Sequence, residues 1–348
     1  MWKTTAGEIA ELSEGELQGQ AEVEITGVAT LQEAGSEDVA FMAEERLAEA
    51  AAESGAAVLL APHPVEGFGG TQVICSDPEL AFSRLLKSLH AEMFPPPAPG
   101  ISDRAVISPE AQLGQNLTAG ACCVIEAGAQ IGDNVVIHPL AYVGRNARIG
   151  DDTVIHANTT ICERTEVGAR CHIGPGAIIG DEGFGFIQRD GHSIRMEHVG
   201  ACRIGDDVEV GSLSSIDRGK ISDTTVGNGV KIDKHCHVGH NCTVEDHCIL
   251  VGYARMAGSV HIHRGALLAA DVQVRDHVDI GEGAVLAAGT GAARDVEAGA
   301  QVWGTPPRPL RKEIRIKSLI GRLPEMKQQI RDLKKQVEEL QQRLDQEQ

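Results

Sequence analysis

Aliphatic residues recur at every sixth position through the middle of the chain, in two registers. The first register holds Ile, Leu or Val at twelve of thirteen positions, which are Ile107, Leu113, Ala119, Ile125, Ile131, Ile137, Val143, Ile149, Ile155, Ile161, Val167, Ile173 and Ile179. The second is apolar throughout, at Val226, Ile232, Val238, Val244, Leu250, Met256, Ile262, Leu268, Val274, Ile280 and Leu286. A period of six fits neither the 3.6-residue turn of a helix nor the two-residue alternation of a half-buried strand.

The six-residue period predicts a triangular coil with three short strands in each turn. One aliphatic residue on each side would fill the interior, while glycine, asparagine and aspartate would form the corners. Eighteen residues then make one coil, and coils stack at the strand spacing of roughly 4.8 Å. The pattern resembles that of hexapeptide-repeat proteins, which implies a left-handed coil. We therefore predict a mainly β fold, a left-handed parallel β-helix of hexapeptide repeats, over residues 101–306.

The segments on either side of the repeat have other patterns. Residues 1–100 combine short apolar runs typical of strands (AEVEITGVA, DVAFMA, AAVLLAP, TQVICS) with two helical segments (EERLAEAAAESG, DPELAFSRLLKSLHAEM), the second beginning at Asp77 as N-cap. The proline-rich stretch FPPPAPG indicates a stiff linker. We predict an N-terminal α/β domain and linker over residues 1–100.

The last segment, 307–348, is predicted to be a helical tail with a coiled-coil seam between subunits. Its apolar residues follow spacings of 7, 4, 3, 4, 3 and 4, at Leu319, Met326, Ile330, Leu333, Val337, Leu340 and Leu344. The beginning of the tail concentrates basic residues, at Arg308, Arg311, Lys312, Arg315 and Lys317. These predict a docking surface for an acidic partner, although a solvated helix face would have the same composition.

The repeat is interrupted between Ile179 and Val199 by the segment GDEGFGFIQRDGHSIRMEHVG. An insertion that leaves a solenoid is usually a loop on its working face. The alternative is a tolerated surface excursion.

Composition limits the possible functions. A formal net charge of −19 argues against nucleic-acid binding, which requires basic residues to neutralise phosphates. The polar N-terminus MWKTTAGEIAELSEGELQ lacks the apolar core of a signal peptide, and no apolar run reaches the length of a membrane span. Nine cysteines without a secretory signal are expected to be reduced thiols. We expect a cytoplasmic protein with at most peripheral membrane contact.

Histidines and cysteines cluster in KIDKHCHVGHNCTVEDHCIL, which at first suggests a metal site. However, Cys236, Cys242 and Cys248 each lie two residues before an aliphatic position, so we expect them to pack inside the coil as small hydrophobic residues. His240 lies two residues past the inward-facing Val238, near a corner. Gly258 is one full coil further along the chain and is therefore expected directly over His240.

The motifs IDKHCHVGHN, MAGSV, SSIDRG and GDEGFGF, following an α/β domain, resemble those of the UDP-3-O-(3-hydroxyacyl)glucosamine N-acyltransferases of lipid A biosynthesis. The resemblance covers nearly the whole chain. It implies His240 as the catalytic histidine, Gly258 as the oxyanion-binding glycine and His277 as a second histidine of the site. Asp233 is a candidate to orient the imidazole.

The resemblance also implies substrate contacts and partners. It makes residues 1–100 a nucleotide (uridine)-binding domain, in which Phe41 falls on the uracil-stacking aromatic position. Asn241 and Phe184 are expected to contact substrate. Leu47 stands where the family often has a tyrosine, and Glu182 where it usually has an aspartate. The implied donor is a 3-hydroxyacyl thioester of acyl carrier protein, the acceptor is the 2-amine of a UDP-sugar, and the assembly is a homotrimer. No cofactor and no metal are expected.

Three other functions remain as alternatives. A trimeric zinc carbonic anhydrase uses the same coil with histidine ligands. Another hexapeptide-repeat acyltransferase, such as the O-acyltransferase of the same pathway, would begin directly with the repeat. A non-enzymatic scaffold would give His240 no part in acyl transfer.

Overall fold

The computed structural model describes residues 2–346, except for the side chains of residues 344–346. It divides the chain into two compact units, Met1–Pro97 and Ala98–Gln348. The boundary lies inside the predicted proline-rich linker, whereas the helical tail is part of the second unit. None of the described helices is long and apolar enough to cross a membrane.

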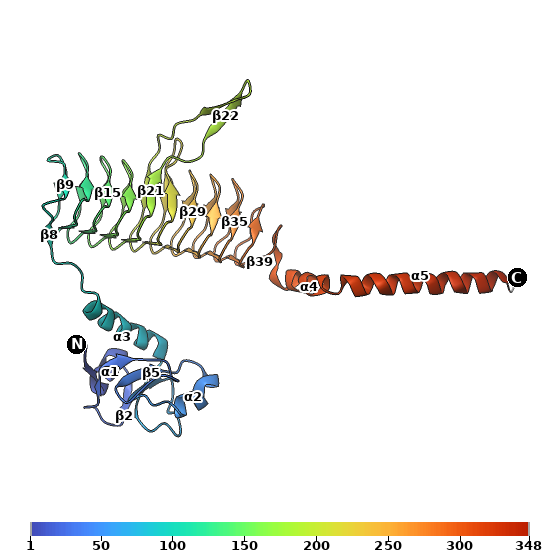
Figure 1. Cartoon of the computed structure of the whole chain (residues 1–348), viewed down its shortest axis with the longest axis horizontal. Coiled ribbons are helices and arrows are strands. Elements are labelled where there is room, and N and C mark those ends of the chain that lie inside the picture. Colours follow the sequence, from blue (N-terminus) through green and yellow to red (C-terminus); the bar gives the residue numbers. More distant parts are fainter. Residues whose placement is uncertain (1, 347–348) are drawn as a thin grey trace. The chain divides into compact units, whose positions relative to one another are not determined.

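The N-terminal unit is a five-stranded sheet with helices (Figure 1). The sheet order is β2 (Glu16–Gln18), β7 (Thr71–Ile74), β6 (Val58–Ala61), β5 (Asp38–Phe41) and β4 (Gly27–Val28), with only β2 antiparallel to its neighbour. The remaining elements are β1 (Thr4–Thr5), α1 (Ala6–Ser13), β3 (Glu24–Ile25), η1 (Glu45–Leu47), α2 (Ala48–Ala52) and α3 (Pro78–Met93). The predicted cap of α3 is confirmed, because the Asp77 side chain accepts a hydrogen bond from the Leu80 N–H at 2.9 Å. Helix α1 is an addition to the predicted elements, and Thr5 and Glu8 form a capping box at its start.

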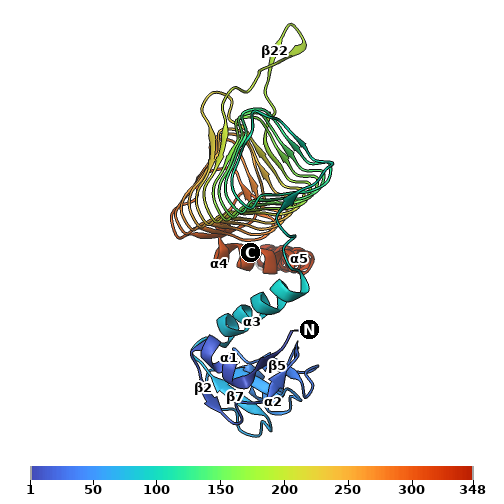
Figure 2. The ribbon, with the colours of Figure 1, turned by 90° about the vertical axis from the view of Figure 1, so that its left-hand side faces the viewer.

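The second unit is dominated by three parallel sheets that form the sides of a triangular prism, seen end-on in Figure 2. The nine-stranded sheet contains β10 (Gln112–Leu113), β13 (Gln130–Ile131), β16 (Arg148–Ile149), β19 (Glu166–Val167), β24 (Cys202–Ile204), β27 (Thr224–Val226), β30 (Thr243–Val244), β33 (His261–Ile262) and β36 (Asp279–Ile280). The ten-stranded sheet contains β9 (Val106–Ile107), β12 (Val124–Ile125), β15 (Tyr142–Val143), β18 (Thr160–Ile161), β21 (Ile178–Asp181), β26 (Ser215–Asp217), β29 (His237–Val238), β32 (Arg255–Met256), β35 (Gln273–Val274) and β38 (Gly291–Ala292).

The twelve-stranded sheet contains β8 (Gly100–Ile101), β11 (Thr118–Ala119), β14 (Val136–Ile137), β17 (Val154–Ile155), β20 (His172–Ile173), β25 (Glu209–Val210), β28 (Lys231–Ile232), β31 (Ile249–Leu250), β34 (Leu267–Leu268), β37 (Val285–Leu286), β39 (Gln301–Trp303) and β40 (Arg308–Pro309), of which β40 alone pairs antiparallel. Regular neighbours lie one coil apart in the sequence, as in the pairing of Ile131 with Ile149. The predicted parallel β-helix of hexapeptide repeats is therefore confirmed.

The interior is a continuous stack of the repeated aliphatic residues. Ile125, Ile137 and Ile155 are fully buried, whereas Leu113, in the outermost coils, is 39% exposed. Cys236, Cys242 and Cys248 are also buried in this stack, as predicted. Burial raises the pKa of the Cys242 thiol to about 12, so this thiol is protonated and unreactive at neutral pH.

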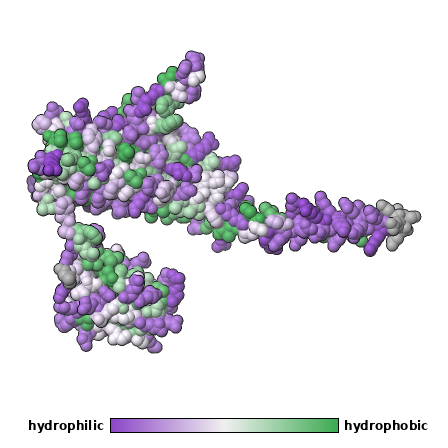
Figure 3. Space-filling model, viewed as in Figure 1, coloured by the Kyte–Doolittle hydropathy of each residue, from purple (hydrophilic) through white to green (hydrophobic). Residues whose placement is uncertain are grey.

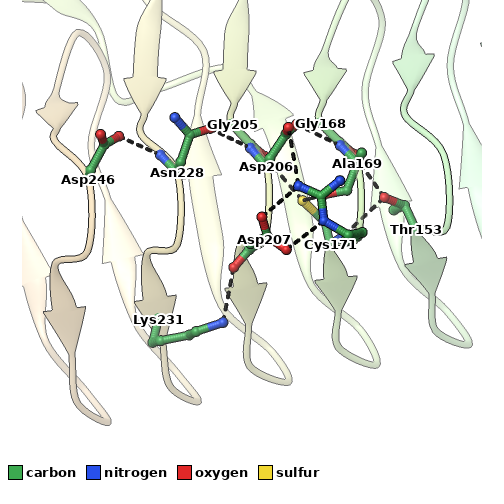
Figure 4. Close-up of polar contacts among 11 residues, drawn as sticks. Thr153, Gly168, Ala169, Cys171, Gly205, Asp206, Asp207, Asn228, Lys231 and Asp246 are labelled. Atoms are coloured by element: carbon green, nitrogen blue, oxygen red, sulfur yellow. Dashed lines mark hydrogen bonds and ion pairs between the residues drawn. The ribbon is translucent and has the colours of Figure 1, made fainter.

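The corners are held by side chains that bond to the backbone of the preceding coil. The Asp246 carboxylate accepts from the Asn228 N–H at 2.7 Å, Asn228 Oδ1 accepts from the Asp206 N–H at 2.8 Å, and the Asp206 carboxylate accepts from the Ala169 N–H at 2.9 Å (Figure 4). Asn116, at the same edge of the prism in an earlier coil, has a positive φ of 56°. Asparagine and aspartate tolerate this conformation better than other side chains, which explains their use at corners.

Two insertions interrupt the solenoid, and the repeat pattern predicts only one of them. The first is the segment after β21, which forms an antiparallel hairpin of β22 (Phe186–Arg189) and β23 (His192–Arg195) and projects from one corner of the prism (Figures 1 and 2). The second adds four residues between β26 and β27, because Ile216 pairs with Val238 rather than with Lys234, which lies one regular coil on. The two insertions contact each other, since the Gly200 N–H donates to the Gly219 carbonyl at 2.9 Å.

The tail comprises α4 (Leu310–Ile320) and α5 (Leu323–Gln346). Helix α4 packs on the last coil, where Lys317 Nζ lies 4.0 Å from the centroid of the Trp303 ring and the buried Glu313 pairs with Arg308 at 2.9 Å. Figure 3 shows a mainly hydrophilic surface on the visible side of α5. The described seam residues of α5 are exposed: Met326, Ile330, Leu333, Val337 and Leu340. Leu344 lies outside the residues whose side chains are described.

Candidate active site

His240 follows β29 and lies in a surface groove of about 390 Å³. The groove is lined by Phe184, Asp217, His237, Gly239, His240, Arg255, Met256, Ala257, Gly258, Gln273 and Val274. Larger grooves of about 470 and 580 Å³ follow the nine-stranded sheet and do not include His240. The groove therefore brings together His240, Gly258 and Phe184 of the predicted site.

The imidazole of His240 lies against Gly258 of the next coil, as the repeat predicts. A Cβ atom on Gly258 would come within 2.5 Å of His240 Cε1 and 2.8 Å of Nε2. Any larger residue would thus displace the ring. In the part of the chain that the structure describes, the Gly258 N–H has no hydrogen-bond partner, whereas the Gly258 carbonyl accepts from the His277 N–H at 3.3 Å.

Asn241 fixes the orientation of the His240 ring. Asn241 Oδ1 accepts from the Lys220 N–H at 2.9 Å, and Nδ2 donates to the Ser222 carbonyl at 2.9 Å, so the two ends of this amide can be told apart. His240 Nδ1 lies 3.0 Å from the same Oδ1. Because an amide oxygen can only accept, Nδ1 of the neutral ring must carry the proton. Nε2, the atom nearer Gly258, is then an unprotonated acceptor.

This geometry changes the expectation for Asn241. We predicted that its side chain contacts substrate, but the amide is occupied by Lys220, Ser222 and His240. Both Lys220 and Ser222 belong to the four-residue insertion that breaks the register. Asn241 is therefore a positioning residue, held in place by a segment that the repeat pattern does not predict.

Asp233 does not orient His240, and this expectation is wrong. Asp233 follows β28 in the twelve-stranded sheet, and its carboxylate accepts from the Gly252 N–H at 3.0 Å. His240 follows β29 in the ten-stranded sheet. The two side chains therefore lie at different corners of the triangle, with one full side between them.

The carboxylate at the site is that of Asp217, at the end of β26. Asp217 is 8% exposed, and its Oδ2 lies 3.7 Å from His237 Nε2, while His237 Nδ1 contacts the Ser215 hydroxyl at 2.8 Å. Burial raises the pKa of Asp217, and the nearby His237 and His240 oppose that rise. Sequence reasoning gave Asp217 no role, although it belongs to the motif SSIDRG.

The first insertion closes over His240 with its glycines. A Cβ on Gly183 would lie 2.9 Å from His240 Cδ2 and 3.1 Å from Asp217 Oδ2, and a Cβ on Gly185 would lie 2.6 Å from His198 Cε1. The His198 ring meets the His240 ring edge-on, with centroids 5.1 Å apart. These close approaches explain why GDEGFGF is rich in glycine.

His198 is almost completely buried, and neither of its ring nitrogens has a hydrogen-bond partner among the described residues. Burial, followed by the proximity of His240, lowers the pKa of His198. His198 is thus a neutral wall of the site. On the same insertion, Glu182 pairs with Arg195, which holds the pKa of Glu182 below its usual range.

The other predicted site residues are exposed beside the groove or belong to the N-terminal unit. Phe184 is 85% exposed at the rim of the groove. The side chain of His277 is exposed at a corner of the coil that follows the coil of Gly258. In the N-terminal unit, Phe41 packs against Phe82 with ring centroids 4.6 Å apart, whereas Leu47 packs in a different hydrophobic cluster.

The basic residues of the tail are only partly available for a partner. Arg308 is paired with Glu313 and Lys317 is stacked on Trp303. Arg311, Lys312 and Arg315 are exposed, and no ion pair of theirs is found within the described range. We call Arg311, Lys312 and Arg315 the α4 basic patch, and the docking of an acidic partner on the five basic residues stays a prediction.

Comparison with known proteins identifies the family. The family model described as UDP-3-O-(3-hydroxymyristoyl) glucosamine N-acyltransferase, LpxD, matches residues 22–88. The bacterial transferase hexapeptide (six repeats) model matches residues 146–181 and 223–258, and the gap between these ranges contains both insertions. Among solved structures, the Arabidopsis UDP-N-acetylglucosamine acyltransferase is similar, with a TM-score of 0.55, 24% identity and coverage of 66% of this chain and 80% of that one. At that identity the likeness shows the fold alone.

Curated relatives extend the match over nearly the whole chain. A UDP-3-O-acylglucosamine N-acyltransferase of Pseudomonas syringae pv. tomato is 34% identical over 305 residues, covering 87% of this chain and 86% of that protein. The one of Pseudomonas fluorescens (strain SBW25) is 36% identical over 329 residues, covering 94% and 93%. A non-enzymatic scaffold is thus excluded. The chain is an N-acyltransferase and belongs to the UDP-3-O-acylglucosamine N-acyltransferase family.

Proposed function

We propose that the protein transfers a 3-hydroxyacyl group from the thioester of acyl carrier protein to the 2-amine of UDP-3-O-(3-hydroxyacyl)-glucosamine, a step of lipid A biosynthesis. Membership of the N-acyltransferase family supports the reaction class. The observation that carries the proposal is the pairing of an unprotonated His240 Nε2 with the Gly258 backbone in one groove.

His240 is the general base in this proposal. The amine nitrogen attacks the thioester carbonyl carbon, a C–N bond forms, and the carbonyl electrons move to oxygen. His240 Nε2 takes the proton that the nitrogen loses. Collapse of the intermediate then breaks the C–S bond, and the same Nε2–H returns the proton to the departing thiolate. A positioned base of this kind is worth about 10²–10⁴-fold in rate.

Gly258 binds the oxyanion of the tetrahedral intermediate. Its N–H is free among the described residues, and one such donor contributes roughly 10²–10³-fold. The His277 N–H holds the Gly258 carbonyl, so His277 supports this peptide as well as being the predicted second histidine. Phe184, exposed at the rim, is suited to contact the acyl chain or the sugar.

The substrate and partner assignments complete the proposal. Phe41 would stack on the uracil of the UDP-sugar, with Leu47 unable to provide a second aromatic face. The α4 basic patch would receive the acidic acyl carrier protein. The exposed seam of α5 supports a homotrimer. Cytoplasmic location and peripheral membrane contact at most remain predictions of the sequence.

The proposal is tested by incubating the protein with 3-hydroxyacyl-acyl carrier protein and the UDP-sugar amine, and detecting the amide by mass spectrometry. His240→Ala should lower kcat at least about a hundredfold, and Gly258→Ala should do the same because the new methyl group displaces the imidazole. His247→Gln, at an exposed corner, is the control and should retain full activity.

Two results would contradict the proposal. One is the absence of amide with every acyl-carrier thioester tested. The other is near-normal turnover by His240→Ala, with circular dichroism showing that the variant is folded.

A further inference from the structure

A cluster of two histidines and two carboxylates lies on the nine-stranded sheet, away from the His240 groove. Glu245 follows β30, His261 and His263 flank the inward-facing Ile262 of β33, and Asp279 begins β36. The pairing of Thr243 with His261, and of His261 with Asp279, stacks these residues on three successive coils. None of them lines the groove of His240.

Three donor atoms of this cluster converge on one point. Glu245 Oε1 lies 2.9 Å from His261 Nε2 and 3.1 Å from His263 Nδ1, and all three atoms lie within 4.8 Å of one another. Zinc–ligand bonds of roughly 2.0–2.1 Å in a tetrahedron separate neighbouring donors by about 3.3 Å. The donors are therefore close to the spacing that a tetrahedral ion requires, with little movement of the side chains.

The surrounding groups orient these donors as they do around protein-bound metals. His263 uses Nδ1 toward Glu245, and its other nitrogen, Nε2, lies 2.8 Å from Asp279 Oδ1. A carboxylate behind a ligating histidine fixes the tautomer of the ring and increases its basicity. Glu245 Oε2 accepts from the Arg264 N–H at 2.9 Å, which keeps Oε1 directed toward the two imidazoles.

Charge and exposure also fit a cation. Glu245 places one carboxylate beside His261 and His263, and Asp279 places a second carboxylate beside His263. The side chains of Glu245, His261 and His263 are between 31% and 38% exposed, which leaves room for water as a fourth ligand. Two imidazoles and one carboxylate favour zinc over magnesium or calcium, which prefer oxygen ligands alone.

We propose that Glu245, His261 and His263 bind one zinc-class divalent transition-metal ion, with Asp279 as the supporting carboxylate. The ion would join the coil of Glu245 to the next coil and thereby brace the C-terminal part of the solenoid. The ion takes no part in acyl transfer. If the protein binds no such ion, the proposed acyltransferase function is therefore unaffected.

The experiment uses the full chain, freed of metal by a chelator and then dialysed. Zn²⁺ is titrated in competition with a chromophoric chelator, and Co²⁺ is added separately as a probe, because tetrahedral Co²⁺ absorbs strongly in the visible range. We expect one tight site per chain. Asp279→Asn should weaken binding about 10–100-fold, as expected for a supporting carboxylate, and His263→Gln should weaken it more.

His192→Gln is the matched control, since His192 is an exposed strand residue on β23 of the projecting hairpin. Its affinity for Zn²⁺ should equal that of the wild type. If the wild type shows no tight site, or if folded Asp279→Asn and His263→Gln bind as tightly as the wild type, the proposal is overturned and the cluster is a hydrogen-bonded proton network. If His263→Gln does not fold, the isosteric Asp279→Asn decides alone.

Discussion

His240 owes its chemistry to one neighbouring amide. Without Asn241 the ring could rotate or exchange its proton between the two nitrogens, and Nε2 would be a base only part of the time. The amide is itself held at both ends by backbone groups of the four-residue insertion, Lys220 N–H and Ser222 C=O. The four-residue insertion thus positions Asn241, and Asn241 in turn determines which nitrogen of the neutral His240 ring carries the proton.

Asn241→Ala should therefore lower kcat by about 10–100-fold while leaving the KM values nearly unchanged, because the amide orients the base and does not touch substrate. Steady-state kinetics with each substrate varied in turn measures this split. Ser222→Ala is the control, since it removes only the hydroxyl that shares the Asn241 amide with the Ser222 carbonyl. A variant Asn241→Ala with wild-type kcat would show that the ring is held by other groups.

At the scale of single residues, the sequence predicted His240 and Gly258 because their stacking follows directly from the length of one coil. It could not predict Asp217 as the carboxylate at the site, or the role of Asn241. Both depend on the second insertion, whose four residues leave no periodic signal. The zinc-class cluster does have a signal in the sequence, because His261 and His263 flank an inward-facing position and Glu245 lies one coil before His263.

At the scale of elements, the repeat brings like residues into columns. His138 follows β14 and His156 follows β17, and their rings stack 5.0 Å apart at an interplanar angle of 3°. The ring of His172, on β20, lies 6.5 Å from that of His156. Burial lowers the pKa of His138 and His156, and neighbouring histidines lower that of His156 further. His138 and His156 are therefore mainly neutral at pH 7 in the folded chain.

This column should make the solenoid sensitive to acid. The pKa values of His138 and His156 are lower in the folded chain than the unfolded value of about 6.5. Their contribution to the free energy of unfolding is therefore complete above pH 6.5 and is lost as the pH falls through the folded pKa values. The free energy of unfolding in urea should decrease between pH 7 and pH 5. His156→Gln should make the slope shallower by at most about 1.4 kcal/mol per pH unit, whereas His192→Gln should not. Equal slopes for His156→Gln and wild type would contradict the prediction.

The repeat pattern predicted the regular strands but not the hairpin of β22 and β23 or helix α1. Period six predicted every regular strand pair, since each coil repeats the contacts of the last. The projecting hairpin of β22 and β23 was seen only as an interruption, because its strands pair with each other and bury little: all eight of their residues are exposed. The helix α1 was missed because a single eight-residue helix gives only two turns of periodicity.

At the scale of the whole molecule, two surfaces of the tail have different uses in the proposed function. The α4 basic patch has three cations without ion-pair partners in the described part of a chain with net charge −19. In the proposed function, a strongly acidic partner would be attracted to this patch and repelled by the net negative charge of the rest of the chain. The seam of α5 is apolar and continuous, and it buries its residues only if other copies cover it.

Changing Arg311, Lys312 and Arg315 together to Glu should raise KM for the acyl-carrier substrate about tenfold or more at low salt, with kcat and the KM for the UDP-sugar little altered. The effect should shrink as salt screens the charges. Steady-state kinetics at two salt concentrations measures both. Arg331→Glu, on α5, is the charge-matched control. A salt-independent, unchanged KM would remove the docking assignment.

Leu333→Glu combined with Val337→Glu should weaken association of the subunits, because two buried charges per copy would face each other in a coiled-coil seam. Sedimentation equilibrium should give three times the 36.9 kDa chain mass for the wild type and a larger dissociated fraction for the variant. Gln342→Glu, off the seam, serves as the control. An unchanged mass at the lowest measurable concentrations would place the subunit contacts elsewhere.

The regular coils are interchangeable, and this has a consequence for how such a chain can change length. Each presents the same edge to the next, so an exact duplication or deletion of one complete coil before β18 would leave every junction as it was. The coil of β24, β25 and β26, which has one insertion at each end, has no equivalent and can be neither copied nor lost without destroying the groove. Evolution and protein engineering can therefore lengthen or shorten the prism on the N-terminal side of the coils that form the groove.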